Sequence, residues 1–204
     1  MKDDETVRAG YEAIAPTYHA GRVSRESANV VWLDQLRNKL PVSGKVVDLG
    51  CGAGVPITRY FAERGYDVEG FDLSPAMIAI ARREVPAARF AEARIEDLAF
   101  EPVSLDLVLS FFAIIHIPRE RHAALLSKIG DWIRPGGVAL LTLGVEDVPH
   151  RSEENWHGVS MIWSHFDAAT NLSMLRDAGL VPEWQEIETF GPTEAHLFVL
   201  ARRA

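Results

Sequence analysis

The chain has 204 residues, of which 48% are hydrophobic and 25% charged, and its formal net charge is −8. This composition predicts one globular domain with a full core, and the negative charge argues against a protein that attracts nucleic acid or an anionic membrane through its overall field. No apolar run reaches the length of a membrane span, and the first residues form no apolar signal segment. The single cysteine, Cys51, excludes an intrachain disulfide, so we expect a cytoplasmic protein.

Helical and strand patterns alternate along the chain. The expected helices cover residues 6–20, 27–40, 56–64, 119–132 and 167–179, with one more after Ser74, and the expected strands cover 45–48, 66–72, 88–91, 105–109, 138–143, 181–189 and 196–202. Turns are expected at 135–137 and at 191–192. The second turn joins the last two strands, which must therefore run antiparallel. The pattern predicts an α/β fold: a three-layer, doubly wound, seven-stranded sheet that is mostly parallel, with an antiparallel last strand and helices on both faces.

A glycine-rich loop follows the first expected strand. Asp48 ends the strand, and Gly50, Gly52 and Gly54 follow at alternate positions, so the backbone can press against a ligand without intervening side chains. The helix start behind the loop offers free N–H groups and a partial positive charge to an anionic group. The carboxylate of Asp48, in turn, suits a ligand that carries an ammonium or another cation.

The spacing of the loop differs from the dinucleotide fingerprint G-x-G-x-x-G. The third glycine of that fingerprint would fall at Val55 or at Ile57, depending on the register. An acid two residues before Gly50 would also repel a pyrophosphate. Both observations argue against a nicotinamide-dependent oxidoreductase.

The loop reads Asp-x-Gly-x-Gly-x-Gly and resembles the first motif of the class I S-adenosylmethionine-dependent methyltransferases. Residues 72–77, Asp-Leu-Ser-Pro-Ala-Met, are similar to the second motif of that family, and Asp72 lies 18 residues after Gly54. An acid at this distance can accept hydrogen bonds from both ribose hydroxyls of an adenosine. The resemblance extends from Tyr11 to about Leu200 and implies S-adenosylmethionine as cofactor, with S-adenosylhomocysteine as product.

The segment after the third strand departs from the family pattern. Ala93 and Arg94 stand where the family often has Gly-Asp, so the usual acceptor for the adenine amino group is missing unless Glu92 or Glu96 substitutes. The backbone N–H of Ile95 can still meet an adenine ring nitrogen. The expected cofactor-binding residues are Tyr18, Asp48, Gly50, Cys51, Gly52, Gly54, Asp72, Leu73, Met77, Arg94, Ile95, Glu96 and Phe111.

Two features near the expected ligand carry candidate chemistry. His116 follows the fourth strand and is the candidate catalytic residue, because a histidine near neutrality can remove a proton from a nucleophile; a hydrogen bond to a neighbouring loop is the alternative. Tyr11 and Tyr18 lie on one helical face and resemble the lid of small-molecule methyltransferases. We expect Tyr18 at the cofactor and Tyr11 nearer the methyl acceptor, with core packing as the alternative.

Residues 144–166 are expected to form a long loop that caps the acceptor, since loops of this length in compact domains are usually functional or disordered. Its tryptophans and histidines disfavour disorder. A metal site is disfavoured, because neither His-x-His nor His-Glu-x-x-His occurs and no metal ligand is expected. The expected substrate-binding residues are Tyr11, Phe112, His116, Trp156, Trp163 and His165.

The single domain, 1–204, is expected to comprise a helical lid (1–40), a cofactor-binding core (41–143), the cap loop (144–166) and a C-terminal helix with a strand pair (167–204). The predicted reaction moves a methyl group to O, N or S of a small molecule by in-line displacement, which depends mainly on positioning. The expected partner is this acceptor, without nucleic acid or membrane, and the protein is expected as a monomer or homodimer. The alternatives are an NAD(P)-dependent oxidoreductase, a methyltransferase for nucleic acid or protein, and a non-catalytic S-adenosylmethionine-binding protein.

Overall fold

The structure is a computed structural model that describes residues 2–23, 33, 39–190 and 194–204. Its centre is a sheet with the strand order β3-β2-β1-β4-β5-β9-β8. Every neighbouring pair from β3 to β5 is parallel, whereas β9 pairs antiparallel with both β5 and β8. The strands are β1 (Lys45–Leu49), β2 (Asp67–Asp72), β3 (Arg89–Glu92), β4 (Leu105–Ser110), β5 (Ile133–Gly144), β8 (Leu180–Thr189) and β9 (Ala195–Arg203). The predicted seven-stranded sheet and its antiparallel last strand are confirmed.

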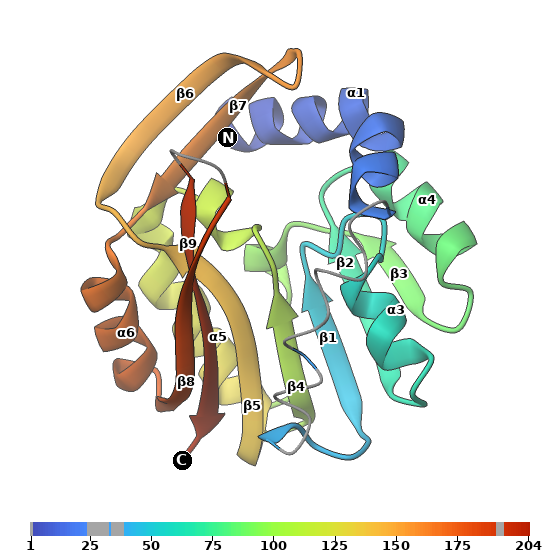
Figure 1. Cartoon of the computed structure of the whole chain (residues 1–204). Helices are drawn as coiled ribbons and strands as arrows, with labels where there is room; N and C mark the ends of the chain where they lie inside the picture. Colours follow the sequence, from blue (N-terminus) through green and yellow to red (C-terminus); the bar gives the residue numbers. More distant parts are fainter. Residues whose placement is uncertain (1, 24–32, 34–38, 191–193) are drawn as a thin grey trace.

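Helices cover both faces of this sheet, which gives the three predicted layers (Figure 1). Strand residues alternate between the faces: Val46 and Leu107 pack in one apolar cluster with α3 and α4, and Val47 and Val108 pack in the other with α5 and α6. The helices are α3 (Ile57–Ala62), α4 (Pro75–Glu84), α5 (His122–Trp132) and α6 (Ala168–Asp177), with short 3-10 turns η2 (Ile95–Asp97), η3 (Ile114–His116) and η4 (Arg119–Arg121).

Side-chain caps begin two of the helices. The Ser74 hydroxyl accepts a hydrogen bond from the N–H of Met77 at the start of α4, and the Asp167 carboxylate accepts one from the N–H of Thr170 at the start of α6. Each cap satisfies a donor that the helix itself leaves unpaired. Both starts were predicted, because a capping residue stands directly before a helical pattern.

The N-terminal helix α1 (Lys2–Val23) lies over the carboxyl edge of the sheet (Figure 1). It is longer than the predicted 6–20 at both ends. The second predicted helix, 27–40, lies mostly outside the described residues. Leu33 is one of the few residues of this range that the structure describes, and it is fully buried in the core. Within the part of the chain that the structure describes, no helix has the length and apolar character to cross a membrane.

The segment expected as a cap loop, 144–166, is instead mainly a β-hairpin. Strands β6 (Val148–Trp156) and β7 (Val159–His165) pair antiparallel as a separate sheet, which arches above the main sheet beside α1 (Figure 1). His157 and Gly158 connect them with φ of 51° and 86°, as a type I′ turn requires. The prediction of a loop was wrong because β6 is almost entirely exposed and polar, so the alternation of apolar residues that marks a strand is absent.

The predicted turn at 135–137 is also different in the structure. It lies within β5, where the pairing with β4 shifts between Ile133 and Val138, and Gly136 has a φ of 80°. The residues therefore form a local irregularity of one strand rather than a connection before it. The expected turn at 191–192 lies outside the described residues.

Candidate active site

A cavity lies between the carboxyl edge of the main sheet and α1. Its walls come from α1, the loop after β1, the ends of β2, β4, β8 and β9, and the turns η2 and η3. Ligands of open α/β sheets bind at this edge. Among the residues expected at cofactor, acceptor or chemistry, those that line the cavity are Tyr11, Tyr18, Asp48, Gly50, Cys51, Gly52, Asp72, Leu73, Met77, Arg94, Ile95, Glu96, Phe111, Phe112 and His116.

The glycine loop turns sharply at the end of β1. The N–H groups of Gly50 and Cys51 both donate to the carbonyl oxygen of Phe71, at 2.8 and 2.9 Å, which fixes the loop against β2. Gly52 has a φ of 53°, and a Cβ on it would meet no atom within 4 Å. Gly54 instead packs toward Phe90 and does not line the cavity. At Gly52 the loop therefore faces the cavity, with free space where a side chain would be.

Asp48 is buried beneath this loop, with 2% of its surface exposed. The Thr58 hydroxyl donates to its carboxylate at 2.6 Å. Burial raises the pKa of Asp48 to about 7; the Thr58 hydrogen bond lowers it, and the charge of Asp72 adds to the rise. A cation at the cavity wall would favour the ionised form, so Asp48 is suited to hold an ammonium group.

Asp72 stands at the end of β2 with its carboxylate fixed by backbone donors. The N–H of Gly52 donates to one carboxylate oxygen and the N–H of Ser74 to the other, both at 2.9 Å. Burial raises the pKa of Asp72, and these backbone hydrogen bonds lower it. Each oxygen keeps a second lone-pair position, so the carboxylate can also accept hydrogen bonds from a ligand.

His116 of η3 belongs to a hydrogen-bond chain at the cavity. Its Nδ1 lies 2.6 Å from the carbonyl oxygen of Ile162, and its Nε2 lies 3.0 Å from the Tyr11 hydroxyl. Because a carbonyl oxygen only accepts, Nδ1 carries the proton and Nε2 accepts from Tyr11. Burial lowers the pKa of His116 to about 4, so the ring is neutral at pH 7.

This neutral histidine makes stability depend on pH. The folded pKa of His116 lies below its unfolded value of 6.5, so the stabilisation is complete above pH 6.5 and is lost as the pH falls toward 4. Between pH 7 and pH 5 the loss is about 2 kcal/mol. We expect urea midpoints to show this loss in the wild type relative to His116→Gln. The raised pKa of Asp48 acts in the opposite direction, but it is common to both proteins, and parallel pH profiles would contradict the assignment.

Four aromatic side chains form a continuous surface beyond β4, here called the phenylalanine wall: Phe111, Phe112, Phe190 and Phe198. The ring centroids of Phe112 lie 5.7 Å from Phe190 and 5.8 Å from Phe198, and Phe111 lies 6.2 Å from Phe198. Phe112 has a φ of 58°, a conformation that is costly for a residue with a Cβ and that accumulates at functional sites.

Sequence reasoning missed the part of the cavity that β8 and β9 contribute. Glu188 and Phe190 stand at the end of β8, and Phe198 lies on β9. The continuous apolar run of β9, residues 197–201, was visible in the sequence. Its placement next to β5, which brings it to the cavity, depends on the strand order and carries no local motif.

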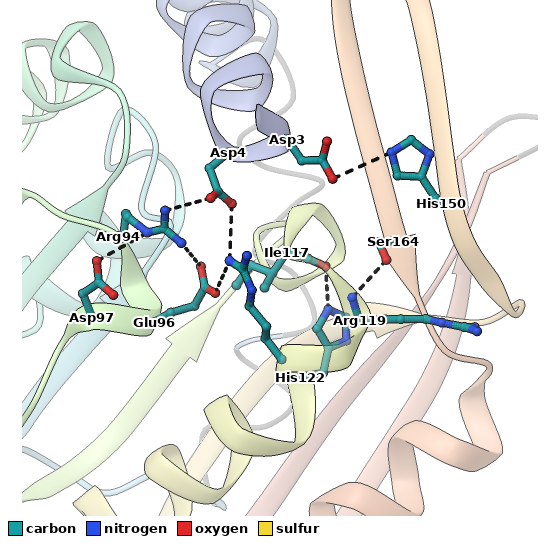
Figure 2. Close-up of polar contacts among 11 residues, drawn as sticks. Asp3, Asp4, Arg94, Glu96, Asp97, Ile117, Arg119, His122, His150 and Ser164 are labelled. Atoms are coloured by element: carbon teal, nitrogen blue, oxygen red, sulfur yellow. Dashed lines mark hydrogen bonds and ion pairs between the residues drawn. The ribbon is translucent and has the colours of Figure 1, made fainter. Parts of the chain in front are cut away.

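An ion-pair network, here called the Asp4 network, joins α1 to the segment after β3 (Figure 2). Arg94 donates to Asp4 at 2.7 Å and to Glu96 at 3.3 Å, and Arg121 lies 2.9 Å from Glu96 and 3.7 Å from Asp4. Asp4, Arg94 and Glu96 all line the cavity. The Arg94 that departs from the family pattern therefore binds α1 across the end of the cavity.

A second contact holds α1 further along. Glu12 accepts hydrogen bonds from the Ser74 hydroxyl at 2.7 Å and from the N–H of Ala76 at 3.0 Å, at the start of α4. Charged acceptors are favourable at a helix N-terminus. The helix is thus held before Tyr11, at Asp4, and between Tyr11 and Tyr18, at Glu12.

We expect Asp4→Asn to weaken binding of S-adenosylhomocysteine about two- to fivefold, because losing one partner of a mostly covered ion pair weakens the attachment of α1 by about 0.5–1 kcal/mol. Calorimetric titration measures this change. Because salt screens the ion pair, 0.5 M NaCl should reduce the difference in affinity between the wild type and Asp4→Asn. Asp3→Asn is the matched control: Asp3 lies 3.8 Å from His150, on the other side of the helix end (Figure 2), and does not line the cavity. Equal effects of the two variants would contradict a role for the Asp4 network.

Three residues expected at the acceptor do not line the cavity. Trp163 belongs to β7 of the hairpin and is buried, 5.8 Å from both His116 and Trp156 between ring centroids. Trp156 packs against Tyr11 and Tyr18, and the Nδ1 of His165 donates to the carbonyl oxygen of Glu146 at 2.9 Å. The tryptophans thus pack behind the residues that face the cavity. Among the described residues, no group of three His, Cys, Asp or Glu side chains is placed to hold a metal ion.

The sheet order, the glycine loop after β1 and the paired acids at the ends of β1 and β2 define an adenosyl-cofactor protein of the Rossmann-like class. A family model described as a methyltransferase domain matches residues 46–137. The chain belongs to the class I S-adenosylmethionine-dependent methyltransferases.

Individual relatives carry the same description. The chain is 34% identical over 151 residues to a malonyl-[acyl-carrier protein] O-methyltransferase of Enterobacter lignolyticus, with 72% of this chain and 57% of the relative covered. The matched part of the chain covers 57%, 45% and 64% of the length of three such curated relatives.

Solved structures share the fold. The structure titled DhpI-SAH complex has a TM-score of 0.76 at 24% identity, with 98% of this chain and 96% of that chain covered. The magnesium protoporphyrin IX methyltransferase of Synechocystis PCC 6803, solved with bound SAM, has a TM-score of 0.73 at 19% identity, with 100% and 98% covered.

Proposed function

We propose that the protein is an enzyme that transfers a methyl group from S-adenosylmethionine to O, N or S of a small molecule. The observation that carries this proposal is the cavity itself, in which Asp48, Gly52 and Asp72 face one space under α1. These residues fit the cofactor: Asp48 for its ammonium, Asp72 for the ribose hydroxyls, and Gly52 as a position at which any side chain would fill the space. When bound, the cofactor supplies an activated methyl group on a sulfonium.

The chain's own contribution to the reaction is placement and exclusion of water. Tyr11 and Tyr18 close the cavity from above, and the phenylalanine wall closes it from the side of the sheet. A dry site keeps water from competing for the lone pair of the nucleophile, and positioning alone supplies effective molarities equivalent to about 7–11 kcal/mol. His116 stays the proposed catalytic residue, with Nε2 as the acceptor and Tyr11 as the group it orients.

A small acceptor is favoured over a polymer by the cover of the cavity. α1 and the hairpin lie above the carboxyl edge of the sheet (Figure 1), and the net charge of −8 repels nucleic acid at long range. The relatives include a protein named trans-aconitate 2-methyltransferase and one named ubiquinone biosynthesis O-methyltransferase, both with small-molecule names. We also propose that the protein is a monomer or homodimer and is located in the cytoplasm.

Two measurements test this function. Calorimetric titration should give tight binding of S-adenosylhomocysteine and none of NADH or NADPH, which separates the methyltransferase from an oxidoreductase. Incubation with methyl-labelled S-adenosylmethionine and fractionated metabolites should place label in a small molecule. Label in RNA or protein alone would support the polymer alternative, and binding without any turnover would support a non-catalytic binding protein.

A further inference from the structure

The charge of the cavity lining is strongly one-sided. Its carboxylates belong to Asp4, Asp48, Asp72, Glu96 and Glu188, whereas Arg94 carries the one guanidinium among the described lining residues. That guanidinium is already paired with carboxylates in the Asp4 network. Two histidines line the cavity as well. His116 is neutral because burial lowers its pKa to about 4, and the Nε2 of His19 lies 3.5 Å from the carboxylate of Glu84. The described lining therefore holds no uncommitted cation to pair with an anionic acceptor.

The carboxylates fall into two groups along the cavity. Asp48 and Asp72 stand at the ends of β1 and β2, where the cofactor is proposed to bind, and Asp4 and Glu96 close the neighbouring end. Glu188 stands apart from them at the end of β8, four strands away from β1 in the sheet. It is therefore the carboxylate available to the acceptor.

Glu188 is bordered by aromatic rings. It pairs in register with His196 on β9, and the His196 ring lies 5.0 Å from Phe112 between centroids. Phe190 of the phenylalanine wall directly follows β8 and Phe198 lies on β9, with ring centroids 6.2 Å apart. Burial raises the pKa of Glu188, and the charge of Glu186 raises it further. A cation close to this carboxylate would relieve both effects.

We propose that the methyl acceptor is a small amine with an apolar body, held with its nitrogen between the Glu188 carboxylate and the phenylalanine wall. This inference rests on the proposed methyl transfer and names its acceptor class. A carboxylate acceptor would lose its hydration without gaining a cation, which is costly. An ammonium gains both the charge of Glu188 and the negative faces of the phenylalanine rings.

The reaction balances with the groups in the cavity. The bound ammonium first gives one proton to the Glu188 carboxylate, which leaves a neutral amine with a free lone pair. The amine nitrogen then forms a bond to the methyl carbon as the carbon–sulfur bond of the sulfonium breaks, and the electron pair of that bond stays on sulfur as a thioether. The product is the methylated ammonium, and Glu188 releases its proton to water, so each turnover frees one proton.

The test uses three probes that share one apolar body: 2-phenylethylamine, 2-phenylethanol and 3-phenylpropanoate. Each is titrated calorimetrically into the full chain saturated with S-adenosylhomocysteine. We expect the amine to bind at least tenfold more tightly than either other probe, and mass spectrometry with S-adenosylmethionine to detect N-methyl-2-phenylethylamine. Equal or tighter binding of the alcohol or the carboxylate, or no binding of any probe, would overturn the amine assignment.

A pair of variants locates the effect. Glu188→Gln should weaken amine binding at least tenfold and leave binding of the alcohol and of S-adenosylhomocysteine unchanged. Glu186→Gln is the matched control, because Glu186 precedes Glu188 by two residues on β8 and does not line the cavity. An unchanged amine affinity in Glu188→Gln would also overturn the proposal. Failure of the wild type to bind S-adenosylhomocysteine would instead contradict the proposed function on which it rests.

Discussion

Replacement of Asp72 by Ala is expected to weaken binding of S-adenosylhomocysteine by about 10- to 150-fold. The carboxylate is the charged acceptor at the end of β2, and loss of hydrogen bonds to a charged group costs about 1.5–3 kcal/mol. The structure adds a second reason: Asp72 also accepts from the N–H of Gly52, so the variant releases the glycine loop from β2 at the position that faces the cavity.

Calorimetric titration measures the loss, and thermal unfolding shows whether the fold is retained. Asp67→Ala is the control, because Asp67 begins the same strand at its opposite end and forms an exposed ion pair with Arg89 at 2.6 Å. Wild-type affinity in a folded Asp72→Ala would rule out the ribose role. Asp72→Asn separates the two reasons, since it keeps the side-chain shape and one backbone acceptor while it removes the charge.

The features that the sequence predicted well are those that one segment decides. A buried strand, a turn of alternate glycines and a helix start occupy consecutive residues, so the loop from Asp48 to Gly54 and its acid are visible without tertiary information. The same holds for the caps Ser74 and Asp167, which act within their own first turn. The antiparallel pairing of β8 with β9 followed because a short connection permits no other direction.

The features that were missed depend on contacts between distant segments. Glu188 reaches the cavity because β9 lies between β5 and β8, an arrangement that no local pattern encodes. The hairpin was not predicted because both faces of β6 are polar, and because its turn is His-Gly in place of the commoner Asn-Gly. Trp163 was expected at the acceptor for its apolar area, yet that area is buried against Met161, Trp156 and the back of His116.

Arg94 departs from the family pattern, and the structure shows which contacts it makes instead. In the sequence it marked a missing adenine contact. In the structure its guanidinium bridges Asp4 of α1 and Glu96 of η2, so the residue that changes the adenine segment also attaches the helix that covers it. One side chain thus couples α1 to η2, which is why Asp4→Asn is expected to act on cofactor affinity.

The second large effect is expected at the glycine loop. Substitution of Gly50 should mainly reduce stability, whereas substitution of Gly52 should mainly reduce cofactor binding. Gly50 has a φ of 76°, and a Cβ on it would stand 2.2 Å from the Cβ of Ala113. Gly50→Ala therefore combines a left-handed conformation, about 1–2 kcal/mol, with overpacking of about 1–3 kcal/mol. We expect urea unfolding to show a loss of about 2–5 kcal/mol.

Gly52→Val should leave the fold largely intact and abolish cofactor binding. The φ of Gly52 is 53°, so the backbone strain is similar, but no atom lies within 4 Å of the added Cβ, and the branched side chain enters the cavity. We expect a stability loss of only about 1–2 kcal/mol together with at least 100-fold weaker binding of S-adenosylhomocysteine.

Gly136→Val controls for the strain alone. Gly136 has a φ of 80°, has no atom within 4 Å of an added Cβ, and lies in β5 away from the cavity lining. It should lose stability as Gly52→Val does and bind S-adenosylhomocysteine as the wild type does. If Gly52→Val and Gly136→Val bind equally well, the glycine loop is only a turn, and the cofactor lies elsewhere in the cavity; if both lose binding, strain rather than steric exclusion is the cause.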